Sequence, residues 1–530
     1  MKEIQPPLEG VRYTDFLVGP FGITPGCEEN QSLEAWQLPF HEVALGALKR
    51  VADVGQRAPL PEDWQPAPAD GAALYRDLAY ERKLHGMIGG LKSYVADKPE
   101  GSAISKFRDN QHEMAEALAE AFEGVRFGEP IRVKSPTGSG KTAVIVGLTE
   151  GLKHKEQPND EAGVLILVPR KDILAQTITA FERFSDTIWP SIYFGEQKNL
   201  SKVTVMTYQS FNKAYEAGLL TKNMFNAVIR DESHRAGGKT ISKNLHDFCY
   251  GSDDEKHMAV FDLSATPRVD EETLVYSKSV VSGIGEGLLA PVSARRIFTG
   301  AQIIERAERF AFQTDFTEGE VGSLIHNQAR NEVIVDEILS GLRGGRRTIV
   351  RCLPGDNLAH PEIIKSMLDA RGKVKIVNPY MEDYERRKPN VVIIRGDMPI
   401  NTRKKLYKVF SEDMNFDLDV LLFVETMTEG WDGPIAKKLI NASPTRAGWL
   451  MEQLFGRVLR PYTRHSGELV TAEAVDLIDR SDSGQVSFTD ILTRDGPEGM
   501  RYREGATVGK DLADLSDPLR RKHGAYELAA

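Results

Sequence analysis

Short apolar runs alternate with helix-like segments through the middle of the chain. Between residues 105 and 290 the runs include 131–134, 163–168, 203–206, 227–230 and 259–263, and an amphipathic segment follows most of them. A second series starts near residue 346 and contains RRTIVRCL, NVVIIRG and DVLLFVET. Short apolar runs separated by helices are typical of parallel strands that are buried on both faces. The pattern therefore predicts an α/β fold with two domains, each a parallel sheet covered by helices.

The two ends of the chain lack this alternation. Residues 1–100 mix proline-rich pieces with helical stretches, and residues 466–530 carry many charges and few strong apolar runs. Proline-rich and charged segments without a regular apolar period favour surface regions over a packed core. We therefore predict a partly helical N-terminal accessory region (1–100), a first α/β domain (101–290), a second α/β domain (291–465) and a C-terminal tail (466–530).

Composition narrows the class of protein. The 530 residues are 41% hydrophobic and 27% charged, which excludes a mainly disordered chain. Three widely spaced cysteines exclude a disulfide scaffold and fit a reducing compartment, so we expect a cytoplasmic protein. We expect no secretory leader and no membrane segment, because no run of about 18 apolar residues occurs. The net charge of −10 excludes a uniformly basic nucleic-acid coat but not a local basic groove.

The octapeptide SPTGSGKT, at residues 135–142, lies between the apolar run IRVK and a helix-like segment. A strand, a glycine-rich loop ending in Lys-Thr, and a helix in this order form a phosphate-binding loop. The glycines let backbone N–H groups face an anion. We expect Lys141 to reach the β- and γ-phosphates and Thr142 to hold Mg²⁺. Ser135 stands where the usual pattern has glycine. The predicted nucleotide-binding residues here are Thr137, Gly138, Ser139, Gly140, Lys141 and Thr142.

An acidic pair, Asp231-Glu232, follows the apolar run NAVI and Arg230. A carboxylate at the carboxyl end of a parallel strand lies where ligands bind in such sheets. We predict that Asp231 contacts Mg²⁺ directly or through water, and that Glu232 orients or deprotonates an attacking water.

With Ser264-Ala-Thr-Pro267 further along, these blocks resemble motifs I, II and III of superfamily 2 helicases of the DExH type. The resemblance implies that Ser264 and Thr266 couple hydrolysis to movement on nucleic acid. It also extends to FRDNQ at 107–111, where Gln111 would read adenine through its amide. Two further blocks would contact a sugar-phosphate backbone, through Pro169, Arg170, Thr207 and Gln209.

In the second series, EGWD at 429–432 resembles motif V in the form found in motor subunits of type III restriction enzymes. QLFGRVLR at 453–460 resembles motif VI, and at helical spacing residues 453, 457 and 460 share one face. The resemblance implies two tandem RecA-like domains with ATP between them. Its nucleotide contacts in the second domain would be Gly430, Asp432 and Gln453, and its catalytic arginines Arg457 and Arg460.

The resemblance and the order of these blocks imply an ATP-dependent helicase or translocase that moves along nucleic acid, most favourably DNA. One alternative is a motor subunit that translocates without unwinding alone, in a restriction, defence or repair complex with a nuclease or methylase partner. An RNA helicase is another. A P-loop kinase or small-molecule ATPase fits less well, because the second α/β domain carries two arginines suited to a phosphoryl group. Intact Lys141, Asp231 and Glu232 argue against a non-catalytic scaffold.

Overall fold

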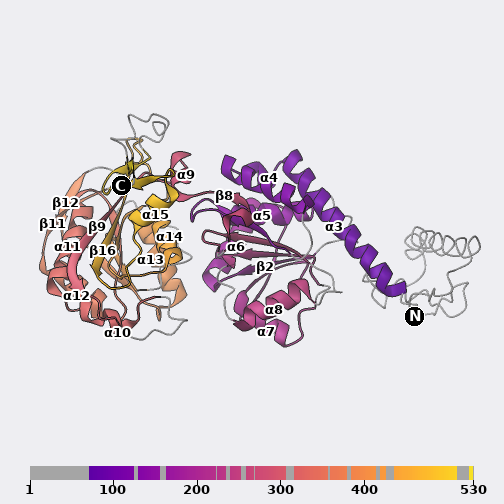
Figure 1. Ribbon diagram of the computed structural model, residues 1–530, viewed down its shortest axis with the longest axis horizontal. Helices are drawn as coiled ribbons and strands as arrows, with labels where there is room; N and C mark the ends of the chain where they lie inside the picture. Colours follow the sequence, from indigo (N-terminus) through magenta and orange to yellow (C-terminus); the bar gives the residue numbers. More distant parts are fainter. Residues whose placement is uncertain are drawn as a thin grey trace, which may run out of the picture.

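The structure is a computed structural model of the chain, and it divides into two α/β domains that lie side by side (Figure 1). It describes residues 71–124, 129–154, 163–221, 224–233, 239–251, 258–267, 269–305, 315–355, 359–378, 383–412, 418–424, 435–509 and 525–528. No helix in these stretches is long and apolar enough to cross a membrane.

The first domain is built on an eight-stranded sheet with the order β4-β3-β5-β2-β6-β7-β1-β8, parallel except for the β3–β4 hairpin. Helices cover both faces, because the side chains of β2 alternate between two core clusters: Val164 and Ile166 in one, Leu165 and Leu167 in the other. The strands are β1 Ile131–Lys134, β2 Val164–Val168, β3 Ser191–Phe194, β4 Gln197–Lys198, β5 Val203–Thr207, β6 Ala227–Asp231, β7 Ala259–Ser264 and β8 Leu274–Ser277. The helices are α4 Asp109–Gly124, α5 Lys141–Leu152, α6 Lys171–Phe184, α7 Tyr208–Glu216 and α8 Lys239–Tyr250, with the short helices η1 Ile104–Lys106 and η3 Glu271–Thr273.

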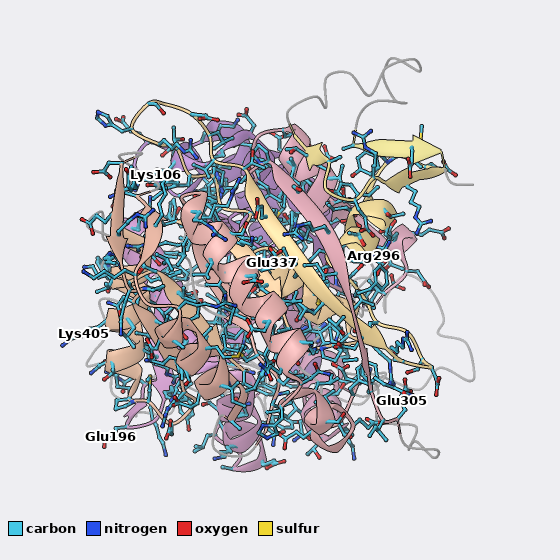
Figure 2. All side chains as sticks on the ribbon, turned by 90° about the vertical axis from the view of Figure 1, so that its left-hand side faces the viewer. Lys106, Glu196, Arg296, Glu305, Glu337 and Lys405 are labelled. Carbon is cyan, nitrogen blue, oxygen red and sulfur yellow. The ribbon has the colours of Figure 1, made fainter. Side chains whose placement is uncertain are left out.

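The second domain has a seven-stranded sheet with the order β13-β14-β10-β15-β16-β9-β18, parallel except for β18. Its strands are β9 Val292–Gln302, β10 Arg347–Arg351, β13 Val391–Ile394, β14 Val420–Phe423, β15 Ala436–Asn441, β16 Ala472–Arg480 and β18 Thr507–Val508; two small sheets pair β11 Val374–Val377 with β12 Tyr384–Arg387 and β17 Met500–Tyr502 with β19 Tyr526–Leu528. The helices are α9 Val280–Gly285, α10 Glu318–Val321, η4 Gly322–Leu324, α11 Gln328–Arg343, α12 Ala359–Ala370, α13 Ile400–Glu412, α14 Gly448–Phe455 and α15 Phe488–Asp495. Glu337 lies on α11, which covers one face of this sheet (Figure 2). Its carboxylate accepts from the buried Lys438 of β15 at 2.9 Å.

The segment after residue 465, expected to form a tail, instead supplies β16, which lies between β15 and β9 in the sheet. Its acidic residues indicated an exposed segment, but Asp476 and Asp479 are buried and are bonded to residues from other parts of the chain. Asp476 accepts from the backbone N–H of Phe488 at 2.7 Å and from Asn441 at 3.0 Å. Asp479 forms a two-bond ion pair with Arg330 at 2.9 Å. Paired in this way, both carboxylates are tolerated in a buried strand.

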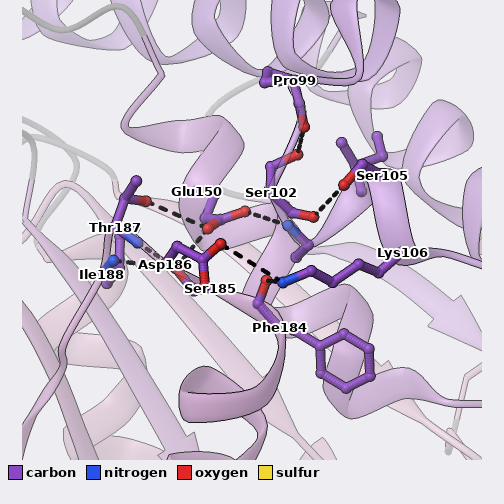
Figure 3. A network of polar contacts seen from close by, with 12 residues as sticks. Pro99, Ser102, Ser105, Lys106, Glu150, Phe184, Ser185, Asp186, Thr187 and Ile188 are labelled. Atoms are coloured by element: carbon purple, nitrogen blue, oxygen red, sulfur yellow. Dashed lines mark hydrogen bonds and ion pairs between the residues drawn. The ribbon is translucent and has the colours of Figure 1, made fainter.

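The N-terminal helix α3, Gly71–Asp97, packs on α5, the helix that follows the predicted phosphate loop. The buried carboxylate of Glu150 on α5 joins them, because it accepts from Tyr94 of α3 and from the N–H of Ala103 at 2.8 Å. The same carboxylate accepts from Ser185 at 2.5 Å (Figure 3). A buried carboxylate is stable only with several donors, so this contact fixes α3 on the first domain. Residues 1–70 of the expected accessory region lie outside the described residues.

Candidate active site

The SPTGSGKT segment forms the turn between β1 and α5, as a phosphate-binding loop requires. Gly138 and Gly140 have φ of +98° and +93°, conformations that L side chains rarely adopt. Within the described residues, the backbone N–H groups of Thr137, Gly138 and Gly140 donate to no protein acceptor. These amides and the positive end of α5 form a cradle for an anion.

Lys141 begins α5, and its side chain turns back over the loop. Its ammonium donates to the Ser135 carbonyl at 2.9 Å and lies 3.7 Å from the Glu232 carboxylate. Ser135, which departs from the usual glycine, is fully buried, and its hydroxyl donates to Ser139 at 2.6 Å. The serine therefore fits the loop, because its hydroxyl ties the two ends of the turn together.

Asp231 ends β6 and is 5% exposed, and Glu232 follows it with a φ of +47°. A positive φ is unusual for a residue with a side chain and needs support from its surroundings. The N–H of Glu232 donates to the Leu263 carbonyl at 2.8 Å, and its carboxylate accepts from the Ser264 hydroxyl at 3.0 Å. The expected residues Glu232 and Ser264 are thus in direct contact.

Gln111 and two neighbours hold the phosphate loop from the side of α4. The Gln111 amide donates to the Gly140 carbonyl at 3.2 Å, while Arg108 and Asn110 both donate to the Ser139 carbonyl at 3.0 Å. Sequence reasoning missed Arg108 and Asn110 as supports of the loop. Burial and the charge of Arg460 lower the pKa of Arg108, so two guanidinium groups flank this cradle.

The second domain contacts the loop through the QLFGRVLR segment. The side chain of Arg460 passes over Gly138, where an added Cβ would lie 3.3 Å from its Cδ and Nε atoms. The backbone of Gly456 packs on Thr137, so that a Cβ on Gly456 would lie 2.4 Å from the Thr137 Cβ. Gly456 was missed as a site residue, although a glycine between two functional positions is a signal of close backbone approach.

The expectation that residues 453, 457 and 460 share one helical face was wrong. Helix α14 ends at Phe455, and residues 456–458 form a turn. The buried Lys437 of β15 stabilises the end of this turn by donating to the carbonyls of Val458, at 3.1 Å, and Arg460. Beyond the end of this helix, Arg457 is 6% exposed, while the side chain of Arg460 reaches the loop of the first domain.

Oxygen donors suited to Mg²⁺ lie beside the phosphate loop. Thr142 is half-buried in the first turn of α5, and Asp231 ends the strand β6. Hydroxyl and carboxylate oxygens that leave room for phosphate oxygens and water are what Mg²⁺ prefers. Among the described residues no group of three or more His, Cys, Asp or Glu side chains gathers to bind a metal by protein ligands alone. The residues therefore fit Mg²⁺ that arrives with a nucleotide.

The remaining expected residues occupy different settings. Arg170 and Gln209 are exposed at the starts of α6 and α7, whereas Pro169 and Thr207 are buried. The Thr207 hydroxyl accepts from the Ser210 N–H at 3.1 Å and so caps α7. The buried Thr266 donates its N–H to the Ser264 hydroxyl at 3.1 Å. Gln453 is also buried, whereas Gly430 and Asp432 lie outside the described residues.

The part of the chain that carries the phosphate loop and the acidic pair is similar to known proteins. Residues 104–269 match the family described as type III restriction enzyme, res subunit (ResIII). The chain is 24% identical over 404 residues to IRC3 of Saccharomyces cerevisiae, named as a candidate ATP-dependent helicase; the match covers 73% of this chain and 53% of IRC3. It is 27% identical over 165 residues to the endoribonuclease Dicer homolog 3b of Oryza sativa subsp. japonica, which covers 28% of this chain and 10% of that protein.

A solved structure shares the fold. The type ISP restriction-modification enzyme LlaBIII bound to DNA aligns with a TM-score of 0.50 at 13% identity, over 71% of this chain and 28% of that enzyme. The chain thus spans about half of IRC3 and about a quarter of LlaBIII. The ResIII match and the two RecA-like domains show that this chain resembles the superfamily 2 helicases and the motor subunits of restriction enzymes.

Proposed function

We propose that this chain is a nucleic-acid-stimulated ATPase that moves along DNA. The observation that carries the proposal is the contact between the domains at the phosphate loop, where Arg460 lies over Gly138 and Gly456 packs on Thr137. A site that draws its groups from two domains works only while they are closed, so hydrolysis can drive their opening and closing.

In this proposal, each group of the site has its own role in binding or hydrolysing ATP. The free loop amides and Lys141 bind the phosphates, Glu232 orients water, and the guanidinium of Arg460 stabilises the charge that develops on the γ-phosphate. Gln111 reads adenine, and Arg457, Gln453, Gly430 and Asp432 complete the second domain's side of the site. Thr142 and Asp231 hold Mg²⁺, which neutralises phosphate charge when bound.

The proposed nucleic-acid contacts begin α6 and α7, at Arg170 and Gln209 with Pro169 and Thr207. Contacts of this kind grip the sugar-phosphate backbone without reading sequence. Ser264 and Thr266 join this face to Glu232, and the Ser264–Glu232 hydrogen bond supports that role. The similarity to the res subunit of type III restriction enzymes supports a second candidate function, a motor subunit that serves a nuclease or methylase partner.

The deciding experiment compares ATPase rates with single-stranded and double-stranded DNA and RNA. We expect DNA to stimulate turnover and added salt to weaken the effect. Stimulation by RNA alone would favour an RNA helicase, and no stimulation by any nucleic acid would refute the proposal. The Glu232→Gln protein should bind ATP without turnover, and Arg460→Ala should lower kcat far more than nucleotide affinity.

A further inference from the structure

Tyr208, the first residue of α7, connects the start of this helix to the end of β6, where Asp231 and Glu232 lie. Its side chain is 2% exposed and packs in the core cluster that contains Leu167 of β2. Its hydroxyl donates to the backbone carbonyl of Asp231 at 2.9 Å. Since β2 lies between β5 and β6 in the sheet, Tyr208 spans from the end of β5 to the end of β6.

The bonded carbonyl belongs to the peptide that precedes Glu232, whose φ is +47°. Residues in this region persist only where the surrounding structure holds them. Hydrogen bonds from two directions hold this one. From β7 and the residue after it, the Leu263 carbonyl accepts from the Glu232 N–H, and the Ser264 hydroxyl and the Ala265 N–H donate to the Glu232 carboxylate. From α7, Tyr208 donates to the Asp231 carbonyl.

The start of α7, where Tyr208 lies, also carries two of the proposed nucleic-acid contacts. Thr207, one residue before Tyr208, caps α7, and Gln209, one residue after it, is exposed. Tyr208 therefore sits between two proposed contacts on a capped helix that follows β5 without a loop. A shift of this helix start changes the distance between the hydroxyl and the carbonyl, because the ring is rigid and tightly packed.

We propose that Tyr208 is a positioning residue that couples nucleic-acid binding to hydrolysis. Nucleic acid held at the start of α7 fixes the Tyr208 hydroxyl on the Asp231 carbonyl, and this bond keeps Glu232 in the conformation that orients water. The inference rests on the proposed function. It adds a mechanism by which bound nucleic acid regulates hydrolysis at the same ATPase site.

The test compares the Tyr208→Phe variant with Tyr215→Phe. The second is a matched control, because Tyr215 lies on the same helix and its hydroxyl donates to Asp247 of α8, away from the site. ATPase kcat is measured with and without single-stranded oligo(dT), and oligo(dT) affinity by fluorescence anisotropy. We expect Tyr208→Phe to lower the ratio of stimulated to basal kcat about fivefold to tenfold, the effect of losing one buried hydrogen bond, at unchanged oligo(dT) affinity. Tyr215→Phe should keep the parent ratio.

Each other outcome has a definite meaning. A parent protein that no nucleic acid stimulates refutes the proposed function and this inference together. Where a DNA duplex stimulates the parent and oligo(dT) does not, the two variants are compared with the duplex. A stimulated parent with an equally stimulated Tyr208→Phe variant refutes only the coupling, as does an equal fall of basal and stimulated kcat. If the variant does not fold, hydrogen exchange on the parent decides: oligo(dT) should slow exchange of the Glu232 amide, and unchanged exchange overturns the inference.

Discussion

The packing of Gly456 on Thr137 gives the sharpest test of how the two domains share one site. In a Gly456→Ala variant the new Cβ would lie 2.4 Å from the Thr137 Cβ and 2.9 Å from its Cγ2. Carbon atoms in contact prefer about 3.5–4.0 Å, so the two backbones must separate by about 1 Å. A shift of about 1 Å in a catalytic group lowers turnover about 100-fold. Because the nucleotide-binding loop belongs to the first domain, nucleotide affinity should change little.

The assay measures ATPase kcat with saturating DNA and the affinity for a fluorescent ATP analogue. Gly448→Ala is the matched control, since Gly448 begins α14, the helix that ends just before Gly456, and an added Cβ there would meet nothing within 4 Å. Only Gly456→Ala should lose turnover. A kcat within about twofold of the parent for this variant would show that the domain contact at Thr137 is not needed for hydrolysis, and the reasoning from close approach would be refuted.

Two further predictions concern buried polar groups of the second domain. Lys437→Met leaves the carbonyls of Val458 and Arg460 without this donor; we expect kcat to fall about tenfold at retained nucleotide affinity, and equal loss of both would contradict a role in placing Arg460. Burial lowers the pKa of His360 from 6.5 to about 3, and its neutral ring accepts from the Leu353 N–H at 2.9 Å. A folded pKa below the unfolded value means that stability is lost as pH falls below about 6.5, by about 2 kcal/mol at pH 5. Denaturant unfolding at both pH values should show a smaller loss in His360→Gln, and equal losses would contradict this assignment.

Much of the fold and the phosphate loop could be predicted from the sequence, because the relevant information is local. A buried strand, two glycines and Lys141 follow one another directly in the chain, so their spacing alone specifies a strand, a turn and a helix. The same holds for Asp231 and Glu232 at the end of an apolar run. The strand β16 could not be found in this way, since its buried aspartates depend on partners from other segments of the chain, which include Arg330, Thr299 and Asn441.

The sequence by itself determined most of the parallel strands of the two sheets and the residue types that we propose bind a triphosphate. Only the tertiary structure decided which groups support them: Arg108 and Asn110 on the Ser139 carbonyl, Gly456 against Thr137, and the Tyr208 hydroxyl on the Asp231 carbonyl. These contacts join segments that are remote along the chain. Their existence depends on the angle and distance at which strands, helices and whole domains pack, and local spacing carries no information about that packing.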